Sequence, residues 1–195
     1  MQPLINAAVS MFSTPLKTCG TALSLIGMTL TVSSFQARSK KFFVILQTLG
    51  STFFFISYFF LGGIFGAIIN SYYLIRNFVF YKVDLGSSPK KAKTVCLCFC
   101  LGYLATFIIY TVAAGTALIP SLLNFLLVMA STAGTVGFLQ SDPIKLRLWK
   151  YPDSICWLCY NVSCLSLGGI LCEIFNLTSN TISLIRFRHK TDRTG

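Results

Sequence analysis

Long apolar runs separated by short polar segments dominate the sequence. We place seven runs, at about residues 16–36, 42–60, 62–81, 94–115, 119–140, 153–166 and 168–187. The runs are continuous rather than alternating, which indicates helices, and a helix needs about 20 apolar residues to cross the hydrocarbon core of a bilayer. The pattern predicts an all-α integral membrane protein with seven transmembrane helices, preceded by an interfacial segment over residues 1–15.

Composition supports the same class. Hydrophobic residues make up 54% of the chain and charged residues 11%, whereas soluble domains carry about 25% charged residues. A soluble globular protein and a disordered chain are therefore both excluded. The net charge of +11 could indicate nucleic acid binding, but no nucleic-acid-binding signature accompanies it. We expect membrane lipids, and no nucleic acid, as partners of the basic residues.

The positions of the basic residues predict the orientation of the chain. Basic segments follow the first, third, fifth and seventh runs: Arg38, Lys40 and Lys41; Lys82, Lys90, Lys91 and Lys93; Lys145, Arg147 and Lys150; Arg188, Lys190 and Arg193. The connections after the other runs are uncharged. Because basic loops stay in the cytoplasm, the N-terminus is predicted outside and the C-terminus inside. Arg76 and Arg186 end their runs as anchors at the inner interface.

Short motifs recur in order along the two halves of the chain. Residues 61–64 (LGGI) recur at 167–170, residues 70–76, which begin with Asn70, recur at 180–186, and Gln36 is matched by Gln140. The recurrence predicts two parallel triple-helix repeats, 16–81 and 119–187, joined by a basic loop and linker helix over 82–118 and followed by a basic tail over 188–195. The glycine pairs Gly62–Gly63 and Gly168–Gly169 are expected in tight outer turns.

A few polar or aromatic side chains at membrane depth are candidates for a solute pocket, because polar groups in lipid are costly. They are Trp157, Asn161, Asn180, Asn70 and Glu173, the last being the only acid in the interior of a predicted run. Helical rise pairs Asn161 with Glu173 in one tier and Trp157 with Asn180 in a deeper one. An indole and carboxamides suit a small polar solute. The alternative is that the asparagines form hydrogen bonds between helices and that Glu173 is protonated or paired.

Enzymatic chemistry is not expected. His189 is the only histidine, and Cys156 and Cys159 form a CxxC pair on an apolar run without a second pair at zinc spacing. The other cysteines also lie in apolar stretches and are expected to pack as small residues. We therefore predict no catalytic residues, no metal and no cofactor.

The last third of the chain carries a family resemblance. It reads Trp157-x3-Asn161-x6-Gly168-Gly169-x3-Glu173-x6-Asn180-x4-Ile185-Arg186, which resembles the bacterial inner-membrane proteins of the YgjV family, and the likeness extends over about residues 16–188. That family is similar at a distance to the SWEET and PQ-loop proteins. The resemblance implies two triple-helix bundles, a bacterial inner-membrane location and movement of a small solute. The Pro-Gln dipeptide of the PQ-loop group is absent, because Gln36 follows Phe35 and Gln140 follows Leu139.

Two functions remain open at this point. The first is a carrier or facilitator for a small polar solute, in which one triple-helix repeat rocks against the other. The second is a membrane assembly partner or receptor that transports nothing, which the missing Pro-Gln hinges and the short loops favour. Small residues along several runs are also compatible with a homo-oligomer.

Overall fold

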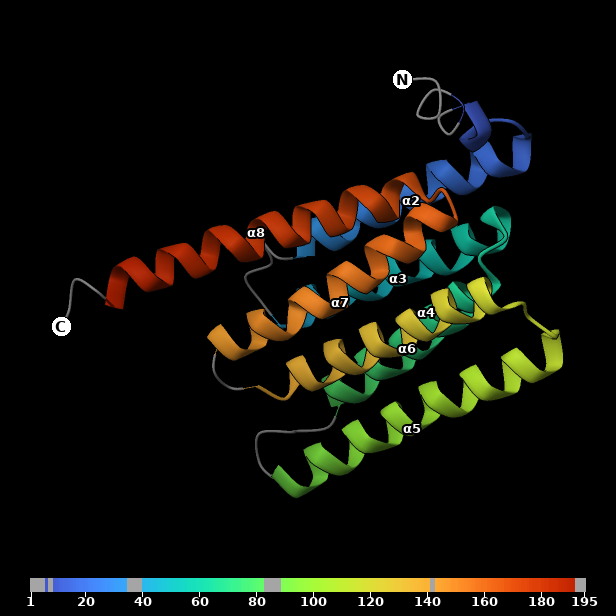
Figure 1. Ribbon diagram of the computed structural model, residues 1–195. Helices are drawn as coiled ribbons and strands as arrows, with labels where there is room; N and C mark the ends of the chain where they lie inside the picture. The colour runs from blue at the N-terminus through green and yellow to red at the C-terminus, as the bar shows by residue number, and fades with distance from the viewer. Residues whose placement is uncertain (1–5, 7–8, 35–39, 83–88, 141–142, 192–195) are drawn as a thin grey trace. The chain divides into compact units, whose positions relative to one another are not determined.

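The protein is all-helical in the part of the chain that the structure, a computed structural model, describes: residues 6, 9–34, 40–82, 89–140 and 143–191. A short helical stretch at 9–11 precedes the first labelled helix. The helices are α2 (Pro15–Ser34), α3 (Lys40–Leu61), α4 (Ile64–Lys82), α5 (Pro89–Ala114), α6 (Leu118–Phe138), α7 (Pro143–Ser163) and α8 (Leu167–Thr191) (Figure 1). Within these residues there is no strand.

Each predicted run corresponds to one of these helices, with one clear difference. The start predicted for the sixth helix, at about residue 153 or within residues 148–151, is too late, because α7 begins at Pro143. Proline suits the first position of a helix, where its missing N–H has no partner to lose. The basic residues that follow, which the sequence analysis placed in a loop, are good helix formers. Gln36 lies outside the described residues.

Among the residues that the structure describes, three helices are long and apolar enough to cross a membrane by themselves. These segments are Val44–Leu61, Lys90–Ala114 and Leu118–Gly137, and α4 adds a shorter apolar segment, Ile64–Phe80. Large apolar side chains on α5 are exposed, among them Leu97, Leu101, Ile108 and Val112. An apolar surface of this kind is suited to lipid rather than to water. The chain is therefore a helical membrane protein.

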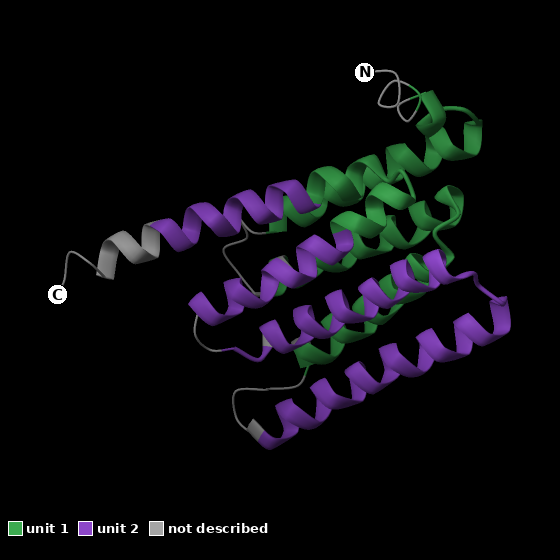
Figure 2. Cartoon of the chain, in the orientation of Figure 1, with its two compact units in different colours: residues 1–84, 158–172 green, residues 85–157, 173–195 purple. Residues whose placement is uncertain are grey.

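Residues 1–84 and 158–172 form a first compact unit, which holds α2, α3, α4, the end of α7 and the start of α8 (Figure 2). Glycines let α2 and α3 approach closely, since a Cβ added to Gly27 would lie 3.1 Å from the carbonyl oxygen of Gly50. Ser57 on α3 donates a hydrogen bond of 2.8 Å to the carbonyl of Gly20 on α2. Close backbone approach and interhelical hydrogen bonds are the usual means of helix association in lipid.

Residues 85–157 and 173–195 form the second unit, with α5, α6, most of α7 and the rest of α8. The hydroxyl groups of Tyr103 on α5 and Thr135 on α6 lie 3.2 Å apart. On α6, Gly134 faces the carboxylate of Asp153 and Gly137 faces the Cβ of Trp149, both on α7. Small residues on α6 thus leave room for larger side chains from α7.

The helix starts recur at a constant interval. The helices α2, α3 and α4 begin at Pro15, Lys40 and Ile64, and α6, α7 and α8 each begin 103 residues later. The turns after α3 and α7 also match at this interval. The Gly63 N–H donates to the carbonyl of Tyr58, as the Ser166 N–H does to that of Asn161, and both turns contain a residue with positive φ, 79° at Gly62 and 53° at Leu165.

This interval corrects the predicted position of the second turn and the predicted match of Asn70, which corresponds to Glu173 rather than to Asn180. Leu165 lies in that turn, whereas Gly168 and Gly169 lie in the first turn of α8. Instead of forming a turn, these two glycines let the start of α8 lie close to α2 and to the end of α7. A Cβ on Gly168 would overlap the backbone of Ser24, and a Cβ on Gly169 would overlap the side chain of Asn161.

Candidate functional site

Tyr58, Tyr160 and Asn161 form a buried polar cluster in the first unit, which we call the tyrosine–asparagine cluster. The Tyr58 hydroxyl donates a 2.6 Å hydrogen bond to Oδ1 of Asn161, and each side chain is only 1% exposed. The rings of Tyr58 and Tyr160 meet edge to face, with centroids 5.9 Å apart. The cluster therefore ties α3 to α7 through side chains that have no access to solvent.

The N-terminal turn of α4 completes this cluster. The first N–H groups of a helix have no partner within the helix, and the Tyr160 hydroxyl accepts a 2.8 Å hydrogen bond from the N–H of Gly66. Gly66 has no side chain, and an added Cβ would lie 2.6 Å from Cε1 of Tyr160. One turn further, the Asn70 amide donates to the Gly66 carbonyl at 2.9 Å. The first turn of α8 is satisfied similarly, because the Gly168 N–H donates to the Ser24 hydroxyl at 3.0 Å.

A second cluster, which we call the charged cluster, lies in the second unit and contains Lys150, Asp153 and Glu173. Lys150 Nζ and Asp153 Oδ2 form an ion pair of 2.7 Å on α7. Asp153 is 5% exposed, and its Oδ1 is buried without a hydrogen-bond partner. Its carboxylate fits against Gly134, where an added Cβ would lie 3.1 Å from Oδ2. A side chain at position 134 would crowd this carboxylate.

Glu173 on α8 joins the charged cluster from the neighbouring helix. Its Oε2 accepts a 3.1 Å hydrogen bond from the Asn176 amide. Asp153 and Lys150 are close enough to act on Glu173 electrostatically, and Ser154 lies beside its carboxyl group. The charged cluster thus combines two acidic side chains and one lysine, with Lys150 and Asp153 on α7 and Glu173 on α8.

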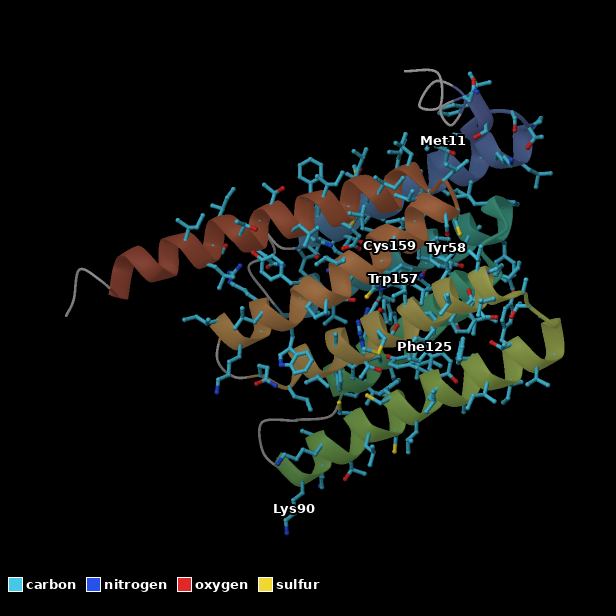
Figure 3. The ribbon with its side chains drawn as sticks, in the orientation of Figure 1. Met11, Tyr58, Lys90, Phe125, Trp157 and Cys159 are labelled. Atoms are coloured by element: carbon cyan, nitrogen blue, oxygen red, sulfur yellow. The ribbon has the colours of Figure 1, made fainter. Side chains whose placement is uncertain are left out.

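Two polar stripes extend from the charged cluster. Lys150, Asp153 and Trp157 follow one face of α7 at the i, i+3, i+7 spacing of a helix, and Glu173, Asn176 and Asn180 follow one face of α8 at the same spacing. A hydrogen bond of 2.7 Å between the hydroxyls of Tyr151 and Thr181 also joins these helices. The Trp157 side chain, labelled in Figure 3, is buried, and Asn180 is half-buried.

The predicted site residues therefore divide between two places. Asn70 and Asn161 belong to the tyrosine–asparagine cluster, whereas Trp157, Glu173 and Asn180 belong to the stripes of the second unit. One pocket lined by all five stays a prediction. Asn161 forms a hydrogen bond between helices, as the alternative interpretation held, whereas Asn70 bonds a carbonyl of its own helix, α4.

The two predicted interface anchors are described to different extents. The Arg76 side chain is buried, with its guanidinium 4.2 Å from the centre of the Tyr73 ring. The side chain of Arg186 lies outside the described residues. Their role as interface anchors stays a prediction.

Sequence reasoning missed Asp153, Lys150, Tyr58 and Tyr160. Asp153 was overlooked because the sixth run was taken to begin at about that residue, which put the acid at a helix end. In the structure it lies in the middle of α7 and is buried, so Glu173 was wrongly taken as the only acid in the interior of a helix. The signal was present in Pro143, which marks the true start. The tyrosines gave no such signal, because aromatic residues are common throughout the apolar runs.

Comparison with known families agrees with this helical membrane architecture. The Imp-YgjV family, described as a bacterial inner membrane protein, matches residues 18–191. The chain belongs to this family. The resemblance inferred from the motif around Trp157 and Asn180 is thereby confirmed, as is the bacterial inner membrane as the location of this Imp-YgjV protein. No curated protein and no solved structure matches the chain.

Proposed function

We propose that this Imp-YgjV protein is a carrier or facilitator for a small polar solute, that it performs no catalysis, and that its solute binds between the polar stripes of α7 and α8. The observation that carries the proposal is the charged cluster, which sets two acids and a lysine on helices of a membrane protein. Ionisable groups at membrane depth are costly and usually mark a solute or ion pathway. Trp157 would offer a flat stacking surface and Asn180 a donor and an acceptor.

The proposal includes a duplicated architecture of two triple-helix repeats joined by α5. The constant interval of 103 residues between helix starts supports it. Contacts between the first two helices of each repeat support it further. Thr31 on α2 faces Gly50 on α3, and at the same interval Gly134 on α6 faces Asp153 on α7. The two contacts are equivalent in position, but the glycine lies on the second helix of the first repeat and on the first helix of the second repeat.

Seven transmembrane helices follow from this plan, because two like-oriented repeats of three helices need an odd number of linking helices. The lysines at the ends of α4 and α5, Lys82, Lys90, Lys91 and Lys93, are exposed. The turns after α3, α5 and α7 carry no charge. This distribution supports an N-terminus outside and a C-terminus in the cytoplasm. Reporter fusions at Lys90 and Gly195 should report the same side of the membrane, and opposite sides would refute the plan.

The proposed mechanism is movement of one repeat against the other, which needs a point where a helix can bend. The Pro-Gln hinge of the PQ-loop group is absent, but Pro152 lies inside α7, between Lys150 and Asp153. Proline has no N–H and removes one backbone hydrogen bond from the helix, so that helices bend at such positions. A weak point in α7 therefore lies within the charged cluster itself.

Solute uptake by purified protein in liposomes tests the proposal. A panel of small polar solutes would be compared for the parent chain, Trp157→Ala and Asn180→Ala. We expect at least one solute to enter faster than into empty liposomes, and both variants to lower that flux. Asn176→Ala is not a suitable control, because Asn176 contacts Glu173. Thr178→Ala, an exposed position on α8 whose hydroxyl bonds its own helix, is the matched control and should leave the flux unchanged.

A membrane assembly partner or receptor is the second candidate function. The tyrosine–asparagine cluster favours it, because two of the predicted pocket residues, Asn70 and Asn161, are used in internal hydrogen bonds. The protein would then function by associating with a membrane partner or with a second copy of itself, and it would transport nothing. Equal flux for the parent, the variants and empty liposomes across the panel would support this second function over the first.

A further inference from the structure

The charged cluster belongs to one half of the chain alone. Lys150, Asp153 and Glu173 correspond, at the 103-residue interval, to the neutral residues Gln47, Gly50 and Asn70. In the first half these positions form neutral hydrogen bonds: Gln47 donates to the Ser34 hydroxyl at 2.7 Å and Asn70 to the Gly66 carbonyl at 2.9 Å. Neutral amides are thus sufficient for packing at two of these places. The charges of the second half need another explanation.

The cluster is unbalanced in charge. Lys150 can neutralise one acid, and it pairs with Asp153 at 2.7 Å. No other cation contributes to the environment of Glu173 among the residues that the structure describes. With both acids ionised, the half-buried Glu173 would carry a negative charge without a counter-charge, which is unfavourable between packed helices. A positive charge must therefore be taken up for the helices to pack in lipid.

A proton fits the cluster better than a metal ion. Na⁺ and Mg²⁺ need several oxygen ligands, and the Lys150 ammonium already occupies Oδ2 of Asp153 and would repel a second cation. No group of three His, Cys, Asp or Glu side chains comes together in the described part of the chain. Asp153 also retains a buried oxygen, Oδ1, that has no hydrogen-bond partner. A buried acceptor of this kind is satisfied when a proton or a donor reaches it.

We propose that Asp153 and Glu173 share one exchangeable proton, which the protein takes from water and returns to water. The proton binds a carboxylate oxygen and leaves it again, so nothing else is consumed. Lys150 neutralises the one carboxylate charge that remains when the proton is bound. Glu173, half-buried, and Pro152, beside Asp153, place the exchange at the point where α7 can bend. Use of this proton to drive solute movement rests on the proposed function, whereas the proton site itself does not.

The composition of the chain allows a direct test. Glu173 is the only glutamate in the sequence, so glutamate labelled with carbon-13 in its side-chain carboxyl reports this residue without any mutation. The full chain, reconstituted in lipid, would be titrated with pH while its labelled carboxyl is followed by infrared spectroscopy. We expect the signal to convert between the protonated and ionised forms, and Asp153→Asn to move the midpoint by about one pH unit.

A matched control comes from the other acids. Asp84→Asn alters an acid that follows α4 in the sequence, and it should leave the Glu173 titration unchanged. The proposal is overturned if the labelled carboxyl keeps one form at every pH, if Asp153→Asn leaves the midpoint in place, or if Na⁺ displaces the proton when choline at equal concentration does not. Titration without uptake would leave the proton site standing and remove the carrier. Uptake by a protein whose Glu173 signal never changes would remove the proton site and leave the carrier standing.

Discussion

Removing the Tyr58 hydroxyl should destabilise the protein without creating a cavity. Tyr58→Phe keeps the ring, which is 1% exposed, and deletes the 2.6 Å hydrogen bond to Asn161. An unsatisfied buried acceptor costs about 1–3 kcal/mol, whereas measured interhelical bonds in lipid average about 0.6 kcal/mol and reach about 1.7. We therefore expect a loss of about 1–2 kcal/mol, which is roughly a 5- to 30-fold change in the unfolding equilibrium.

The measurement is reversible unfolding in mixed micelles, arranged as a double-mutant cycle with Asn161→Leu. The double variant replaces both partners with apolar groups, so it should be less unstable than the sum of the single variants. Tyr103→Phe serves as a control, because Thr135 keeps its 2.7 Å bond to the Ser131 carbonyl when the Tyr103 hydroxyl is removed. A coupling energy of zero between Tyr58 and Asn161 would refute the reasoning.

Three further substitutions test close contacts and the ion pair. Gly66→Ala should cost about 1–3 kcal/mol in the same unfolding assay, because the added Cβ would lie 2.6 Å from Cε1 of Tyr160; wild-type stability would show that the ring moves freely. Gly168→Ala should lower the yield of folded protein more strongly, since its Cβ overlaps backbone of α2, and normal chromatography of this variant would contradict that contact. Lys150→Met should lower the melting temperature because it leaves the buried Asp153 unpaired, at a cost of about 3–5 kcal/mol if the acid stays ionised. Adding Asp153→Asn should restore the melting temperature. Failure of this rescue would mean that the ion pair does not contribute to stability.

The helices themselves could be predicted from the sequence, because continuous apolar runs leave little choice of secondary structure. The turn after α7 could not. Leu165 has a φ of 53°, a conformation that the sequence signals only when glycine or asparagine occupies it. The Gly168–Gly169 pair supplied the expected glycine signal a few residues later, where it serves close packing instead.

The candidate site was predictable in part for a different reason. Glu173 was found because an acid stands out in an apolar run. Its neighbour Asp153 follows a basic segment that resembles a loop in composition, although it is helical from Pro143 onward. The Tyr58 bond to Asn161 joins residues 103 positions apart, and no local pattern announces a contact over that distance.

That same distance has a consequence for the origin of the molecule. The interval between Tyr58 and Asn161 equals the interval between helix starts. Under the proposed duplication both descend from one ancestral position, and a position meets its own copy only on the twofold axis of a homodimer. Two identical side chains would have met there before gene fusion. Joining the copies in one polypeptide freed them to diverge, so that one became a hydroxyl donor and the other a carboxamide acceptor.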